Sequence, residues 1–161
     1  MTVAHETMTY LEIVTAVAPL TTLASRGYKD QKIARKVARM LIWANRQTEE
    51  FEAARKILVE GHAKRDSAGE KVLAREQNAE TQEWRDVPDT FQLDNPTQFR
   101  EDFEGLTATE INTNGLRLTE RELETCKVAP EPAIYVGLGP LFMWDDEGPD
   151  ALELMEDAVD E

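Results

Sequence analysis

The sequence predicts an α+β fold that is mainly α: a long, coiled-coil-like helical hairpin with a small β-hairpin and an irregular C-terminal segment. Three observations indicate it: heptad spacing of apolar residues over residues 29–64, an Asn-Gly pair between two short strand-like segments, and apolar residues interrupted by Pro and Gly after residue 129. A length of 161 residues suits one domain with an appendage. We expect a single domain over residues 1–144 and an acidic tail over residues 145–161.

The first helix is expected to begin at a capping box, in which Thr9 and Glu12 each accept a hydrogen bond from the other's backbone N–H. Apolar residues then recur at helical spacing as far as residue 24. Pro19 lacks an N–H donor and is expected to kink or split this helix, and Gly27 is a plausible break after it.

The strongest pattern predicts a helix from Lys29 to about Lys64. Its seam alternates four and three residues apart, with one polar position: Ile33, Val37, Met40, Ala44, Gln47, Phe51, Ala54 and Leu58. A helix of about 30 residues is roughly 45 Å long, so its seam must face a second helix of this chain or another copy. The first helix is shorter, which leaves part of the seam for a partner.

A second stripe on the long helix is basic and is a candidate partner-binding strip. It consists of Lys29, Lys32, Lys36, Arg39, Trp43 and Arg46. One interpretation is a docking strip for an acidic surface, with the tryptophan as its anchor. The other is a solvated helix face whose tryptophan packs on a loop.

Beyond the long helix, residues 66–69 read as a turn, and residues 66–94 as a polar excursion, either a long loop or partly helical. Asn95-Pro96 then starts a helix that presents apolar residues and ends near Gly105. In residues 110–119, Asn114-Gly115 suits a type I′ turn and predicts a β-hairpin, with Ile111 opposite Leu118 on one apolar face.

The C-terminal part combines a second capping box with a dense apolar segment. Thr119 and Glu122 are expected to open a short helix. The following segment is rich in Pro and Gly, and its large apolar side chains must be buried on the long helix or on a partner. The side chains chosen as a second candidate partner-binding surface are Tyr135, Leu141, Phe142 and Trp144.

The formal net charge of −14 is unevenly distributed. Residues 1–25 carry −2, residues 26–65 carry +6, residues 66–144 carry −9, and residues 145–161 carry −9 with no base. The total makes nucleic acid an unlikely partner and argues against a membrane surface. The apolar stretch from Ile13 to Leu23 is too short to span a bilayer, and no targeting signal is recognised.

No catalytic, cofactor-binding or metal-binding motif emerges, so we expect no cofactor and a protein that is not an enzyme. His5 and His62 stand outside metal-ligand spacings and are expected at the surface. Cys126 has no evident base partner and is expected to be a buried structural thiol.

The order of these features resembles a family of small tailed-bacteriophage proteins of uncharacterised function, encoded among virion genes. The likeness covers about residues 9–142. It is carried by Lys32–Val37 in a basic heptad helix, Phe51–Leu58, the turn Lys64–Gly69, the segment Phe103–Ile111 and the closing segment Pro132–Phe142. The polar stretch 70–94 and the acidic tail depart from the family pattern.

The resemblance implies a virion protein assembled in the host cytoplasm. We therefore expect a non-enzymatic structural or assembly component of the head surface, neck or tail, which docks on other virion proteins and on copies of itself as a homo-oligomer. The alternative is an acidic inhibitor or DNA mimic that binds a host enzyme, which the +6 segment disfavours. A small DNA-binding protein that uses the basic helix is a third possibility.

Overall fold

The structure is a computed structural model that describes residues 7–144. A single domain was expected over residues 1–144, and the contacts group instead into two compact units. The described residues of the first unit are 7–49 and 108–144, and the second unit comprises Glu50–Thr107. The predicted fold class is confirmed: the chain is mainly helical, with long helices packed on one another and small sheets beside them.

Helix α1 (Tyr10–Ala24) begins at the predicted capping box. The Thr9 hydroxyl accepts a hydrogen bond from the Glu12 N–H at 3.2 Å, and the Glu12 carboxylate accepts one from the Thr9 N–H at 3.0 Å. Pro19 was expected to kink or split this helix; the split does not occur, because the helix continues through this residue to Ala24. Leu20 and Leu23 are fully buried after the proline, and their burial outweighs the hydrogen bond that proline removes.

Helix α2 (Gln31–His62) confirms the predicted long helix, and it crosses the division between the units. Every residue of the predicted seam is buried or half-buried. In the first unit, Val37, Met40 and Ala44 join the core. In the second unit, the Phe51 ring lies 6.3 Å from that of Phe103 in α3, so a helix of this chain takes up seam that had been left for a partner.

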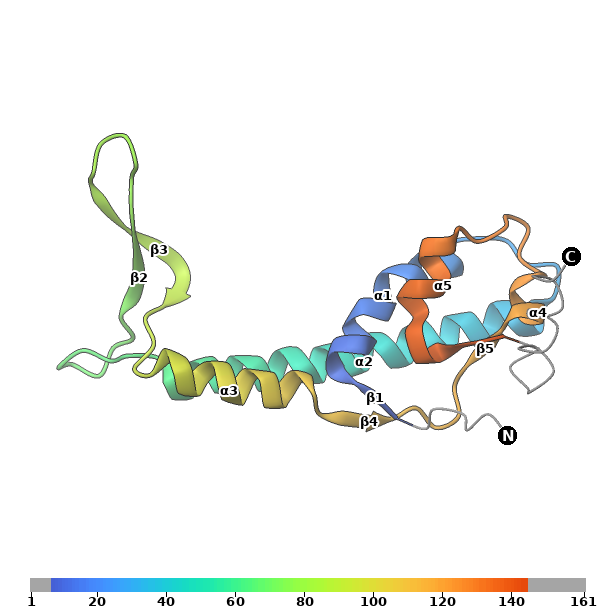
Figure 1. Cartoon of the computed structure of the whole chain (residues 1–161), viewed down its shortest axis with the longest axis horizontal. Helices are drawn as coiled ribbons and strands as arrows, with labels where there is room; N and C mark the ends of the chain where they lie inside the picture. Colours follow the sequence, from blue (N-terminus) through green and yellow to red (C-terminus); the bar gives the residue numbers. More distant parts are fainter. Residues whose placement is uncertain (1–6, 145–161) are drawn as a thin grey trace, which may run out of the picture. The chain divides into compact units, whose positions relative to one another are not determined.

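The core of the first unit lies among α1, the first part of α2, and the segments after residue 115. Helix α5 (Pro132–Leu138) packs along α1, as Figure 1 shows, and a Cβ added at Gly137 would lie 2.9 Å from Cγ of Pro19. A 3₁₀ turn, η1 (Gly139–Leu141), follows. The C-terminal segment is thus more regular than expected, because α5 and η1 bury Ile134, Leu138 and Leu141.

The β-hairpin predicted for residues 110–119 is wrong, although its turn forms. Asn114 and Gly115 have φ values of 55° and 74°, and the Leu116 N–H donates to the Thr113 carbonyl at 3.0 Å. The flanking strands part instead of pairing. Strand β4 (Glu110–Asn112) pairs antiparallel with β1 (Thr7–Thr9), and β5 (Leu118–Thr119) pairs parallel with β6 (Phe142–Met143).

The reason for this pairing lies in burial. A two-stranded hairpin alone is marginally stable, whereas strands from distant parts of the chain bring their own apolar side chains to the core. Ile111 thereby faces Met8, and Leu118 faces Phe142. Met8 and Leu118 are both buried in the core of the first unit, so two short ladders fasten remote segments to it.

Backbone hydrogen bonds join the connection between α1 and α2 to the residues that follow residue 124. The Lys29 N–H donates to the Thr125 carbonyl at 2.8 Å, and the Lys127 N–H donates to the Gly27 carbonyl at 2.7 Å. Helix α4 (Glu120–Leu123) begins at the second predicted capping box, which Thr119 forms with Glu122. These contacts fix α4 against the start of α2.

The second unit contains the end of α2, helix α3 (Pro96–Thr107) and two strands. The predicted cap of α3 is confirmed, because Oδ1 of Asn95 accepts a hydrogen bond from the Gln98 N–H at 3.1 Å. For residues 66–94 a long loop or a partly helical excursion had been expected, but two strands joined and flanked by short loops occupy this stretch. Strands β2 (Leu73–Gln77) and β3 (Trp84–Phe91) form an antiparallel hairpin there, seen in Figure 1.

Candidate interaction surfaces

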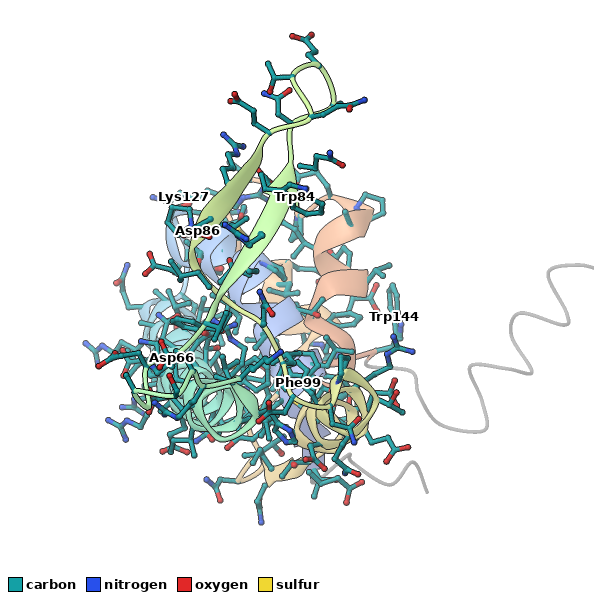
Figure 2. All side chains as sticks on the ribbon, turned by 90° about the vertical axis from the view of Figure 1, so that its left-hand side faces the viewer. Asp66, Trp84, Asp86, Phe99, Lys127 and Trp144 are labelled. Carbon is teal, nitrogen blue, oxygen red and sulfur yellow. The ribbon has the colours of Figure 1, made fainter. Side chains whose placement is uncertain are left out.

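The β2–β3 hairpin is rooted at the end of α2. The predicted turn at Asp66 forms, with Oδ1 of Asp66 accepting from the N–H groups of Ala68 and Glu70. The chain then returns beside the helix end, where the Lys64 N–H donates to the Gln92 carbonyl and the Val72 N–H to the Lys64 carbonyl, both at 2.8 Å. The root is therefore held by a backbone network, and the hairpin extends away from it (Figure 2).

The outer part of the hairpin is held by its own contacts. Arg75 and Asp86 form a cross-strand ion pair at 3.2 Å, and Glu76 pairs with Arg85. At the tip, the Asn78 N–H donates to the Glu83 carbonyl at 2.9 Å, and the Asn78 side chain accepts from the Glu80 N–H at 2.8 Å. The ribbon is thus an ordered element, and most of its side chains are exposed.

Trp84 is the largest apolar group on the ribbon, with 60% of its surface exposed. It lines a shallow, open pocket together with Ala74, Arg75 and Gln92. An exposed tryptophan on a strand suits an interface anchor, because tryptophan is enriched among residues that carry binding energy. Trp84 is not among the site residues that the sequence predicts.

The pairing of β2 with β3 is interrupted between Leu73 and Arg75. Leu73 faces Phe91 and Arg75 faces Asp86, so β3 holds extra residues between the two registers. Pro88 lies in this stretch and has no N–H for a ladder, and Asp89 has a φ of 56°. Such a bulge bends the ribbon and protects its edge from indiscriminate pairing.

Of the four residues predicted to form a C-terminal partner-binding surface, one is fully buried. Leu141 is fully buried in the core of the first unit, so its selection as a partner-binding residue is wrong: an apolar side chain with no exposed area contributes to folding instead. The other three residues form an aromatic cluster. The Tyr135 and Phe142 rings lie 4.8 Å apart, and the Trp144 ring lies 4.9 Å from Phe142 and 5.8 Å from Tyr135.

This cluster has a buried and an exposed side. Tyr135 and Phe142 are half-buried and pack on the core, and burial raises the pKa of the Tyr135 hydroxyl. Trp144 is 47% exposed, and Val136, the residue after Tyr135 in α5, is 81% exposed. The cluster therefore adds a second apolar contact surface, on the first unit.

The predicted basic strip divides into two groups. Lys36 is engaged within the chain, because its Nζ lies 2.7 Å from Oε1 of Glu122. Trp43 is half-buried and packs against the core of the first unit, whereas the second interpretation placed it on a loop. The remaining strip residues are exposed and form no ion pair among residues 7–144: Lys29, Lys32, Arg39 and Arg46.

His62 is not the surface residue that was expected. Its Nε2 lies 2.7 Å from Oδ2 of Asp102, and its ring lies edge-on to Phe99 with centroids 5.7 Å apart. Hydrogen bonds from Gln98 and His62 lower the pKa of the Asp102 carboxyl. The pair fastens α3 to the end of α2 beneath the hairpin root. His5 lies outside the described residues.

Within residues 7–144, no group of three or more His, Cys, Asp or Glu side chains is arranged to hold a metal ion. Cys126 is buried and free, as predicted. None of the helices described here combines the length and the hydropathy needed to cross a membrane. The acidic tail lies outside the described residues.

Comparisons with known proteins give no relative. No protein family, no curated protein and no solved structure matches this chain.

Proposed function

We propose that this chain is a non-enzymatic structural or assembly component of a bacteriophage particle, which acts by docking on other virion proteins. The resemblance to tailed-bacteriophage proteins supports the assignment to a phage particle. The β2–β3 hairpin supports a function in docking on other proteins. This ordered ribbon exposes most of its side chains, and its outer strands bury little against the helices of its own unit.

The hairpin is the observation that carries the proposal. A two-stranded ribbon is marginally stable in water, so an exposed one gains stability when a partner covers it. It can lengthen a neighbour's sheet through the edge of β2, which lacks the bulge and the proline of β3, or place Trp84 in a pocket of that neighbour. The aromatic cluster of Tyr135, Phe142 and Trp144 offers a second contact, which suits a protein that joins two subunits.

The test is incorporation into particles. An antibody against the chain should detect it in purified particles of the phage whose genome encodes it, after sedimentation and washing. Its absence from the proteome of such particles refutes the virion assignment.

A pair of variants tests the hairpin. Trp84→Ala should lower incorporation about tenfold or more, the effect of a binding-energy loss of 1.4 kcal/mol or above. Ile57→Ala is the matched control, because Ile57 is 74% exposed on α2 and lies outside the ribbon. Equal incorporation of the two variants would exclude the hairpin as the docking element.

A further inference from the structure

The first part of α2 carries an unusual concentration of one charge. Between Gln31 and Thr48 the sequence holds five basic residues and no acid, in a chain whose net charge is −14. Like charges three and four residues apart on a helix repel one another. A helix that keeps this arrangement is less stable alone than with a nearby anion.

The structure shows that the chain described here neutralises little of this charge. Glu122 forms an ion pair with Lys36. The other basic residues of this region are exposed and form no ion pair among residues 7–144. We call these exposed bases the basic face: Lys29, Lys32, Arg35, Arg39 and Arg46. Ile42 lies three residues after Arg39 and four before Arg46, so it shares their side of the helix, and it is 59% exposed.

The acidic tail has the complementary chemistry. Residues 145–161 hold nine acids and no base. Leu152, Met155 and Val159 are spaced three and four residues apart, which would place them on one side of a helix and offer an apolar surface to the exposed Ile42. Charge and apolar pattern therefore both match the basic face.

The described part of the chain also ends beside an element that contacts α2. Strand β6 ends at Met143 beside Thr119, which caps the helix that brings Glu122 to Lys36. From Lys36 to Arg46 is about 15 Å along α2, whereas seventeen residues span roughly 25 Å as a helix and about 55 Å when extended. The tail thus reaches the basic face of its own chain with residues to spare.

We propose that the acidic tail docks on the basic face of α2 in the same chain and screens it from other anions. Tethering favours this occupant over a second copy, because a short linker gives an effective concentration in the millimolar range. Nucleic acid is a poorer occupant, because the net charge of the chain repels it. The inference rests on α2 and the tail, and stands independently of the virion assignment.

Zero-length carbodiimide cross-linking of the full chain tests the proposal, because it joins lysine amines to carboxylates only when they touch. We expect cross-links from Lys29 or Lys32 to the tail, which weaken in about 1 M salt, where the Debye length is about 3 Å. Reversing two charges by Arg39→Glu with Arg46→Glu should lower their yield about five- to tenfold. The control is Lys56→Glu with Lys64→Glu, which makes the same charge change at exposed positions outside the first unit.

Mixing unlabelled protein with ¹⁵N-labelled protein separates the two geometries. Docking within one chain gives cross-linked peptide pairs of uniform label, whereas mixed pairs would show a second copy as the occupant and overturn the proposal. Absence of tail cross-links, or equal yields in the two double variants, would also overturn it. Circular dichroism establishes that both variants keep the helix content of the parent chain.

Discussion

The contact between Gly137 and Pro19 gives a sharp test of how α5 packs on α1. A Cβ added at Gly137 would lie 2.9 Å from Cγ of Pro19 and 3.5 Å from its Cβ. Two carbon atoms prefer a separation of about 3.5–4.0 Å, so only the Cγ contact is severe. Because the proline ring is rigid and lies within a helix, the two helices must separate for Gly137→Ala to fit.

The magnitude follows from two opposing effects. Overpacking of this kind costs about 1–3 kcal/mol, and alanine in place of glycine in a helix returns about 0.5–1 kcal/mol. Gly105→Ala in α3 should show the second effect alone, because no atom lies within 4 Å of its added Cβ. The free energies of unfolding of the two variants should therefore differ by about 1–3 kcal/mol, with Gly137→Ala the less stable.

Urea unfolding followed by circular dichroism measures this difference, and a double-mutant cycle identifies its source. Pro19→Ala removes Cγ and keeps Cβ, so Gly137→Ala should become harmless or stabilising in that background. The expected coupling is about 1–3 kcal/mol. If Gly137→Ala stabilises the protein as Gly105→Ala does, or if the coupling stays below about 0.5 kcal/mol, the packing described here is wrong.

Two further predictions concern stability. The guanidinium of Arg26 donates two hydrogen bonds to Glu131 and lowers the pKa of that carboxyl, so this stabilisation is complete above the ordinary glutamate pKa of about 4.3 and is lost as the pH falls below it. The melting temperature should therefore drop between about pH 5 and pH 3, and less so for Glu131→Gln; an unchanged drop would contradict the linkage. Leu138→Ala should lower the free energy of unfolding by about 2–5 kcal/mol, because Leu138 is fully buried, whereas Val136→Ala, at an 81% exposed position of the same helix, should change it by less than about 0.5 kcal/mol. Similar urea midpoints for these two variants would refute the placement of α5.

The candidate surfaces were partly predictable. The basic residues of α2 follow from helical periodicity alone, since an established helix fixes which side chains share a side. Neither the Lys36–Glu122 contact nor the inward packing of Trp43 follows from periodicity, because each depends on what lies against the helix. Trp84 was missed because the polar, charged sequence around it shows no alternation typical of a strand.

The sequence by itself determined the three longest helices and the residues at which α1, α3 and α4 begin, but it did not predict α5. The capping boxes at Thr9 and Thr119, the cap at Asn95 and the uninterrupted α2 all formed where the sequence predicted them. Their hydrogen bonds join residues three or four positions apart, so the information lies within a short window of the chain.

Only the tertiary structure decided which strands pair. The Asn114-Gly115 turn formed as the sequence predicts, yet Ile111 pairs with Met8 and Leu118 with Phe142, because distant strands offered these side chains a buried surface that the hairpin lacked. Conversely, residues 66–94 form a hairpin stabilised by ion pairs across the strands and by backbone bonds at its root. Strand partners are chosen by contacts remote in sequence, and those contacts exist only once the helices are packed.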